Sequence, residues 1–245
     1  LELITKMTLY FLHERVWHKT SFGLPTRLNK AEKIKNEIAS NLFRQASIVD
    51  RLQREELNGN KSFTIWLTGL SASGKSSIAA ELDAWFFSKG LRSYILDGDN
   101  TRIGINSDLS FSNEDRSENI RRVAEICKLF NDAGIIVLAS FISPSSDCRA
   151  LAKSIVGVEA FIEIYVDADI ETCKKRDAKG LYILAEQGII KDFTGINSPY
   201  EVPTNPNVHL KTDITTISFS RNEILNYLQS HDFIPSKLIE DAMNC

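Results

Sequence analysis

Hydrophobic residues follow two alternating patterns along the chain: short continuous apolar runs, and longer segments with apolar positions three or four residues apart. The continuous runs, such as residues 135–141, are typical of strands buried on both faces of a sheet. Strands are predicted at 62–68, 92–97, 135–141, 161–167 and 207–210, and helices at 75–88, 112–133, 144–155, 170–176, 181–187 and 217–228. This alternation predicts an α/β fold with a doubly wound, mostly parallel sheet and helices on both faces.

The first part of the chain has a different pattern. Apolar residues recur at helical spacing within residues 31–57, with Lys, Glu and Arg between them. The turn-forming sequence Asn58-Gly59-Asn60 marks a boundary, so we expect an N-terminal helical extension at 1–60 and the α/β domain at 61–245. The amphipathic segment is expected to pack on the domain's own surface, and a dimer contact or a partner-binding arm is the alternative.

A Gly-x-x-x-x-Gly-Lys-Ser sequence joins the first predicted strand to the first predicted helix. Its glycines allow the backbone to turn its N–H groups inward at the positive end of a helix dipole, which makes a nest for phosphate oxygens. The lysine adds a full charge and the serine hydroxyl can ligate Mg²⁺. This context predicts a P-loop NTPase-type fold rather than a plain Gly/Ser-rich turn. The expected ATP-binding residues are Gly69, Leu70, Ser71, Ala72, Ser73, Gly74, Lys75 and Ser76.

Composition narrows the classes of function. The contents of hydrophobic (43%) and charged (25%) residues are ordinary for a globular protein, and the net charge of −3 does not favour nucleic-acid binding. No apolar run approaches the roughly 20 residues that span a membrane, and the first residues lack the features of a signal peptide. The four cysteines are widely spaced, so reduced thiols and a cytoplasmic location are expected.

Charged residues follow two further predicted strands, and the carboxyl ends of parallel strands meet at one edge of a sheet. After the second strand, Asp97 is expected nearer a Mg²⁺ ion and Asp99 nearer an acceptor hydroxyl, whose proton needs a base. After the fourth strand, residues 176–180 (Arg-Asp-Ala-Lys-Gly) lie where small kinases carry a lid.

Basic residues close to the acidic turn indicate a second, anionic substrate. Arg102 follows the turn, and Arg116, Asn119 and Arg122 lie three residues apart on one predicted helix, where they can share a face. Arginine binds phosphate or sulfate through its planar fork of donors. For Arg121 we expect a solvated helix face instead.

Taken together, these segments resemble the adenylyl-sulfate kinase (APS kinase) family. The resemblance lies in residues 69–76, 96–102 (Leu-Asp-Gly-Asp-Asn-Thr-Arg), 108–112, 115–123, 141–144, 176–182 and 193–201, in the family's order across about 62–230. The run from Asp97 to Val123 is specific to this family, whereas the P-loop alone is not.

The resemblance implies transfer of the γ-phosphoryl group of ATP to the 3′-hydroxyl of adenylyl sulfate, with Mg²⁺, giving ADP and 3′-phosphoadenylyl sulfate. It also implies a homodimer and a possible functional link to an ATP sulfurylase. Carried over by position, the residues that bind adenylyl sulfate are Asp99, Asn100, Thr101, Arg102, Phe111, Arg116, Asn119, Ile142, Ser143, Lys179 and Phe193.

Several of these residues receive a particular role from the resemblance. Phe111 is expected to stack on the substrate adenine, and Arg176 to lie near the adenine of ATP. Asp99, Lys75 and Ser143 are the expected catalytic residues. The family's serine is often described as a phosphorylated intermediate. We expect direct in-line transfer, with Ser143 as a binding residue, because positioning and Mg²⁺ suffice for phosphoryl transfer.

The chain departs from the family pattern near the expected site. The family usually has His, or basic residues, where this chain has Ile103, Ser145, Ser146, Ile183, Leu184 and Glu186. This loss of positive charge motivates an alternative function, a nucleotide-binding regulatory module of the same fold with weak or no turnover. Another P-loop kinase acting on a nucleoside or nucleotide is a further alternative, against which residues 111–122 argue.

Overall fold

The computed structural model describes residues 47–235 and residue 238. Most of the predicted N-terminal helical extension, residues 1–46, lies outside the described residues. The last part of the amphipathic segment forms helix α3 (Arg51–Asn58). Among the described helices, none is both long and apolar enough to cross a membrane.

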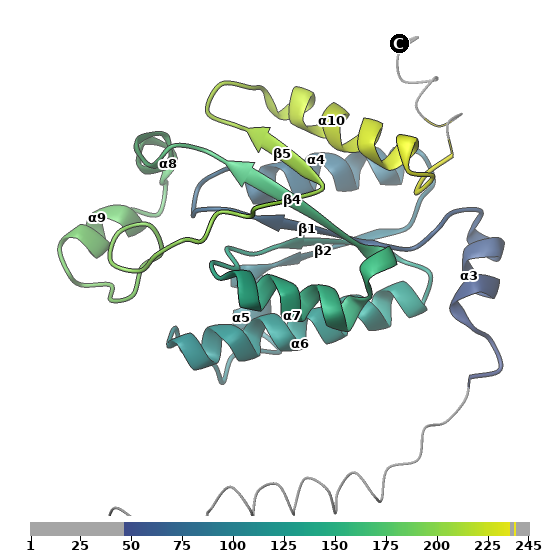
Figure 1. The fold of residues 1–245 in the computed structure, drawn as a ribbon, viewed down its shortest axis with the longest axis horizontal. Helices are drawn as coiled ribbons and strands as arrows, with labels where there is room; N and C mark the ends of the chain where they lie inside the picture. The colour runs from purple at the N-terminus through teal and green to yellow at the C-terminus, as the bar shows by residue number, and fades with distance from the viewer. Residues whose placement is uncertain (1–46, 236–237, 239–245) are drawn as a thin grey trace, which may run out of the picture. The chain divides into compact units, whose positions relative to one another are not determined.

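A five-stranded parallel sheet is the centre of the structure (Figure 1). Its strands are β1 (Thr64–Thr68), β2 (Ser93–Asp97), β3 (Ile136–Ser140), β4 (Phe161–Asp167) and β5 (Val208–Lys211), in the order β2-β3-β1-β4-β5. Every residue of β1 is buried, because β3 and β4 flank this strand and helices cover both of its faces. The predicted doubly wound parallel sheet is confirmed.

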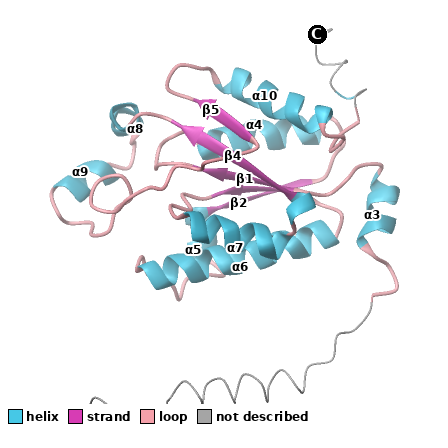
Figure 2. Cartoon of the chain, in the orientation of Figure 1, coloured by secondary structure: helices cyan, strands magenta, loops and turns pink. Residues whose placement is uncertain are grey.

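Long helices cover the two faces of the sheet (Figure 2). One face carries α4 (Lys75–Ser88) and α10 (Ile217–Ser230), and the other carries α6 (Asn113–Asp132) and α7 (Ser146–Val156). Side chains alternate along β1, so Ile65 and Leu67 pack in the α4 core while Trp66 packs in the α6 core. The short helices α8 (Ile170–Arg176) and α9 (Leu181–Glu186) lie beyond the carboxyl ends of the strands (Figure 1).

The observed ends of helices and strands agree with the predicted ones where a capping side chain or a long run of regularly spaced apolar residues marks them. Helix α6 begins after Ser112, whose hydroxyl accepts a hydrogen bond from the Asp115 N–H at 3.2 Å. The helix predicted at 144–155 begins at Ser146 instead, because Ser145 is its N-cap. Helix α5 (Gly98–Ile103) was not predicted, since it has only six residues and no apolar period. A short 3₁₀ helix (Val158–Ala160) was also missed.

Helix α3 belongs to the same compact unit as the sheet, since the chain divides between Ile48 and Val49. The Asn58 Nδ2 group donates to the Gly134 carbonyl at 2.9 Å, which joins the end of α3 to the turn before β3. Gly134 has a φ of +81°, and a Cβ atom there would lie 2.6 Å from Asn58 Nδ2. A glycine is therefore required both by the backbone conformation and by the close approach of α3.

The substitution Gly134→Ala is expected to lower the free energy of unfolding by about 2–4 kcal/mol, measured by urea denaturation. Gly90→Ala is the matched control, because Gly90 has a φ of +72° with no atom near its would-be Cβ. Gly90→Ala should lower the free energy of unfolding by only about 1–2 kcal/mol, because only the backbone conformation is disfavoured there. Equal losses at the two glycines would contradict a tight contact between α3 and the turn.

Candidate functional site

The P-loop lies between β1 and α4, and its first glycine is pressed against β4. Gly69 has a φ of +152°, and a Cβ atom at this position would lie 2.3 Å from the Val166 carbonyl oxygen. At the other end, Gly74 has a φ of +103° and is the N-cap of α4. The Thr212 hydroxyl donates to the Ser73 carbonyl at 2.7 Å. The loop is thus held from outside by β4 and by the residue after β5.

Lys75 lies folded over the P-loop backbone. Its Nζ atom donates to the carbonyl oxygens of Gly69 at 3.0 Å and Leu70 at 2.5 Å. Burial lowers the pKa of Lys75 to about 8, although Cys173 and Asp97 act in the opposite direction. A buried ammonium held by neutral carbonyl and hydroxyl groups favours the arrival of an anion.

A hollow of about 430 Å³ opens beside the N-terminus of α4. Arg176 lines it from α8, and its Nη2 group donates to the Thr212 carbonyl at 2.7 Å. The remaining lining residues are Ala72, Gly74, Lys75, Ser76, Ser77, Ile78, Thr212, Thr215, Ile217 and Ser220. The hollow adjoins the P-loop, so a molecule held there can present a phosphate chain to the loop's N–H groups.

Three oxygen-bearing side chains meet at the end of the P-loop. The Ser76 hydroxyl donates to Asp97 Oδ2 at 2.7 Å, and Ser140 Oγ lies 3.3 Å from Ser76 Oγ. Asp97 Oδ1 accepts the Asp99 N–H at 3.0 Å, which also caps α5. Among the described residues there is no group of three His, Cys, Asp or Glu side chains suited to a metal. A hydroxyl and a carboxylate match the oxygen preference of Mg²⁺, which keeps several of its own waters and phosphate ligands.

The lid segment reaches Asp99 through a charged contact. The Lys179 ammonium forms an ion pair with Asp99 Oδ2, and both side chains are exposed. Hydrogen bonding to Asp99 raises the pKa of Lys179. The Asp177 carboxylate accepts the Tyr182 N–H at 2.8 Å, and the Tyr182 hydroxyl donates to the Ser71 carbonyl at 3.0 Å. The lid is therefore tied to the P-loop on one side and to Asp99 on the other.

Arg102 and Arg116 both contact Phe111, whose ring is exposed. The Arg102 guanidinium carbon lies 4.5 Å from the centre of the Phe111 ring. Burial, and then the neighbouring Arg116, lower the pKa of Arg102. Arg116 donates to the Phe111 carbonyl at 2.9 Å and to the Thr194 hydroxyl at 3.0 Å, next to Phe193. Phe111 is 62% exposed, so one face of the ring is available to a flat ligand.

Other expected substrate-binding residues lie deeper. Asn119 is buried and accepts a hydrogen bond from Asn106 Nδ2 at 3.0 Å. The Thr101 hydroxyl is occupied by backbone carbonyls of its own helix. Ile142 contributes its carbonyl to the Thr68 hydroxyl at 2.8 Å, whereas Asn100 is exposed. Asn106 was missed by sequence reasoning, because only the folded chain brings it against Asn119.

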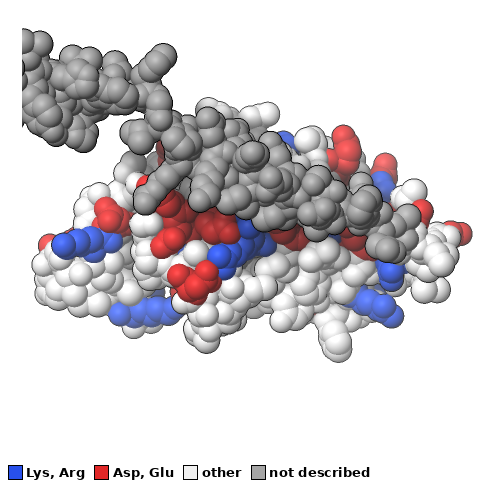
Figure 3. Space-filling model, turned by 90° about the horizontal axis from the view of Figure 1, so that it is seen from below, with Lys and Arg blue, Asp and Glu red and all other residues white. Residues whose placement is uncertain are grey.

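Arg121 and Arg122 belong to the surface of α6. Arg122 pairs with Asp108 at 2.7 Å and with Glu118 at 2.8 Å, and Arg121 also pairs with Glu118, at 2.7 Å. Seen from below, acidic and basic side chains lie side by side on this part of the molecule (Figure 3). The solvated position expected for Arg121 is confirmed. Arg122 is bound to two carboxylates and does not join the contacts of Arg116.

Some positions that depart from the family pattern have structural partners within this chain. Ser145 caps α7, and Ser146 donates to Glu201 Oε2 at 2.7 Å. Glu186 pairs with Lys174 at 2.8 Å, which links the lid helix α9 to α8. Ile103 is 81% exposed at the end of α5. At Ser145, Ser146 and Glu186, the side chain present makes a helix cap, a hydrogen bond and an ion pair, respectively.

Comparison with known proteins identifies the same family as the sequence motifs do. A sequence model of the family described as Adenylylsulphate kinase matches residues 61–211. An adenylyl-sulfate kinase of Clostridium kluyveri is 49% identical over 193 residues, covering 79% of this chain and 96% of that protein. One from Emericella nidulans is 49% identical over 201 residues, covering 79% of this chain and 97% of that protein.

A solved structure is similar in both sequence and fold. It is the Mycobacterium tuberculosis APS kinase CysC in complex with AMPPNP and APS, which is 42% identical to this chain with a TM-score of 0.67. The match covers 69% of this chain and 99% of that chain. With the P-loop, the acidic turn, the arginine-bordered ring and the lid in place, this chain belongs to the adenylyl-sulfate kinase family.

Proposed function

We propose that this chain transfers the γ-phosphoryl group of ATP to the 3′-hydroxyl of adenylyl sulfate, giving ADP and 3′-phosphoadenylyl sulfate. The observation that carries the proposal is the convergence of two anion-binding regions on Asp99. Ser76 of the P-loop bonds to Asp97, which also accepts the Asp99 N–H, and Arg102 of the same short helix lies against the Phe111 ring. Lys179 of the lid reaches the same carboxylate. A relative that was solved with AMPPNP and APS supports the assignment of both ligands.

The residues around the P-loop divide the work of holding the triphosphate. Backbone N–H groups of residues 69–76 cradle phosphate oxygens, and Lys75 turns from its carbonyl partners to the β/γ-phosphates. Arg176 borders the hollow expected to hold the adenine of ATP. Ser76 and Asp97 would hold Mg²⁺, which supplies charge neutralisation at the transferring group when bound.

Asp99 is the group we assign to the acceptor hydroxyl. Its carboxylate is exposed to the site, and Lys179 holds it in place. In this role Asp99 orients the 3′-hydroxyl and accepts its proton as the new bond to phosphorus forms. When Asp99 binds the acceptor hydroxyl, the ion pair between Lys179 and Asp99 opens. The Lys179 ammonium then lies next to the transferring oxygens, where its positive charge stabilises the transition state.

The expected result for Asp99→Asn is a fall in turnover of about 10² or more, because the amide keeps the shape of the side chain but cannot accept the proton. Affinity for ATP should stay nearly unchanged, since Asp99 does not line the hollow at the P-loop. Acceptor-dependent ADP release and ATP titration measure the two quantities. Asp132→Asn, at the exposed end of α6, is the control. A near-normal rate in Asp99→Asn would remove this residue from the mechanism.

Lys75 is expected to make ATP binding depend on pH. The free enzyme holds Lys75 with a pKa of about 8, and a bound triphosphate favours its charged form. Above about pH 8, binding must therefore take up a proton, and affinity should fall as the pH rises. Calorimetry of ATP binding in buffers of different ionisation enthalpy measures this uptake. It should be small at about pH 7, large at about pH 9 and absent in Lys75→Arg, whose guanidinium does not titrate. Uptake that persists in the Arg variant would contradict this assignment.

Ser143 is assigned to binding and positioning rather than to a phosphorylated intermediate. Its side chain is buried, and its hydroxyl is occupied by Thr68 Oγ1 at 2.9 Å and by Trp66 Nε1 at 3.1 Å. Direct transfer between the two substrates requires no attack by this hydroxyl. The expected stereochemical outcome is inversion at phosphorus, measured with chirally labelled ATP. Net retention would demonstrate a covalent step and contradict the assignment.

We further propose that the chain works as a homodimer in the cytoplasm, next to an ATP sulfurylase that supplies adenylyl sulfate. Family resemblance supports the dimer and the partner, and a hexameric APS kinase from Thiobacillus denitrificans (26% identical, TM-score 0.54) is an oligomeric relative. Light scattering of the purified chain tests the dimer, and a monomeric mass with full activity would exclude it.

A further inference from the structure

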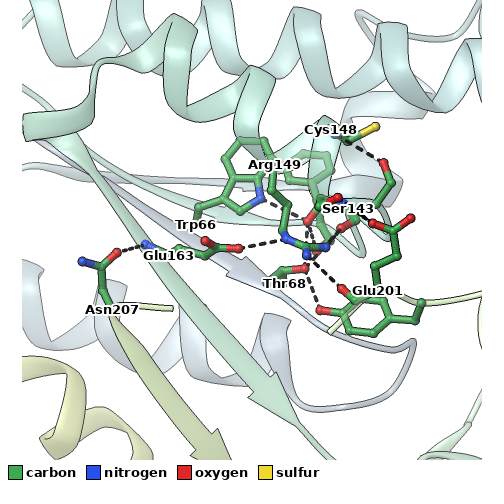
Figure 4. Close-up of polar contacts among 12 residues, drawn as sticks. Trp66, Thr68, Ser143, Cys148, Arg149, Glu163, Glu201 and Asn207 are labelled. Carbon is green, nitrogen blue, oxygen red and sulfur yellow. Dashed lines mark hydrogen bonds and ion pairs between the residues drawn. The ribbon is translucent and has the colours of Figure 1, made fainter. Parts of the chain in front are cut away.

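Arg149 of α7 is a buried arginine that the proposed reaction does not use directly. Its side chain is only 5% exposed, yet all three of its nitrogen atoms have partners (Figure 4). Nε pairs with Glu163 Oε1 at 2.9 Å, Nη1 donates to the Ser143 carbonyl at 2.9 Å, and Nη2 donates to the Glu201 carbonyl at 2.8 Å. One side chain therefore joins β4, the segment after β3, and the segment that precedes β5.

The first of these carbonyls belongs to a strained residue. Ser143 has a φ of +38°, a conformation that a residue with a Cβ atom rarely adopts. Such a conformation persists only where the surroundings determine it, and they do so here through both the hydroxyl and the carbonyl of Ser143. Since Ile142 and Ser143 form one wall of the expected acceptor pocket, Arg149 fixes the shape of that wall.

The second carbonyl belongs to the end of the segment that carries Phe193. Glu201 donates its N–H to the Pro144 carbonyl at 2.8 Å, and its neighbour Tyr200 contacts Thr68 Oγ1 at 2.9 Å through its hydroxyl. At the other end of this segment, Arg116 holds Thr194, next to Phe193. The segment is thus fastened at both ends, by Arg116 and by Arg149.

Glu163 is the charged partner of the Arg149 guanidinium. Burial raises the pKa of Glu163, while Arg149 and Lys153 lower it. The Glu163 backbone is itself fixed, because its N–H donates to Asn207 Oδ1 at 2.8 Å (Figure 4). A buried ion pair generally adds little net stability compared with apolar residues of similar volume, so its presence here needs another reason.

We propose that Arg149 and Glu163 form a positioning pair that shapes the acceptor half of the site, the half formed by Ile142–Ser143 and the segment that carries Phe193. This inference rests on the proposed function, because it concerns the binding of adenylyl sulfate. The pair is expected to leave the triphosphate half nearly unaffected, since neither residue lines the hollow beside the P-loop.

An arginine suits this position for a geometric reason. Its planar guanidinium donates to two carbonyls and forms an ion pair with Glu163, so it joins three segments, whereas a lysine is a single mobile point charge. Arg149→Lys keeps the positive charge but cannot hold both carbonyls and Glu163 together. We expect its KM for adenylyl sulfate to rise about tenfold or more, with affinity for ADP within about twofold of the unmodified chain.

A double variant separates positioning from folding. Arg149→Met with Glu163→Met replaces the ion pair by apolar side chains of similar length, so no unpaired charge is left buried. The Ser143 and Glu201 carbonyls lose their donor all the same. We expect this variant to fold, to unfold at a somewhat lower denaturant concentration because two carbonyls lose their donor, and to show the same rise in KM for adenylyl sulfate.

The experiment measures KM and kcat for adenylyl sulfate, ADP affinity by calorimetry and stability by urea denaturation in each variant. Arg121→Lys is the control, because it makes the same exchange at a solvated arginine of α6. Normal KM values for adenylyl sulfate in folded variants would overturn the inference. So would an equal loss of ADP affinity, or failure of both variants to fold, since the pair would then serve the whole fold. Absence of acceptor-dependent turnover in the unmodified chain would instead overturn the proposed function.

Discussion

The site depends on the close approach of Gly69 to the carbonyl of Val166, where a Cβ atom would lie 2.3 Å from the oxygen. This contact sets the P-loop directly against the end of β4, so the loop's N–H groups face the edge of the sheet where the other strands also end. The Asp97 turn, Ser143 and the lid all follow strands that end at this edge. The site therefore depends on two features. The parallel sheet brings the ends of the strands to one edge, and Gly69 has no side chain to block the close approach of β4.

Charge is divided between the two halves of this site. The triphosphate half offers a buried ammonium, Lys75, held by carbonyl dipoles until an anion arrives. In the proposed acceptor half, Arg102 lies over the exposed Phe111 ring and Arg116 donates to the Phe111 carbonyl. Lys179 pairs with Asp99, so the charge of this carboxylate is already balanced by the lid. Buried Arg149 donates to the carbonyls of Ser143 and Glu201, which border the proposed acceptor half.

Much of this arrangement could be predicted from the sequence, because its signals are local. The P-loop, the Ser112 cap and the apolar strands are each specified by neighbouring residues, and the carboxyl-edge rule brings Asp97, Asp99 and the lid together. The buried contacts could not be predicted in this way. Arg149 meets Glu201, 52 positions away, and Thr212 meets Ser73, 139 positions away, without any local pattern. Only Thr212 had a usable signal, since it directly follows the last parallel strand.

The most direct measurement is ADP release from Mg-ATP by the purified chain, with and without adenylyl sulfate, with the nucleotide product identified by phosphorus and proton NMR. ADP is expected only when adenylyl sulfate is present, in equal amount to a product that carries the new phosphate at the 3′ position. ATP that binds but yields no 3′-phosphoadenylyl sulfate would contradict it, and would favour a nucleotide-binding regulatory protein of the same fold.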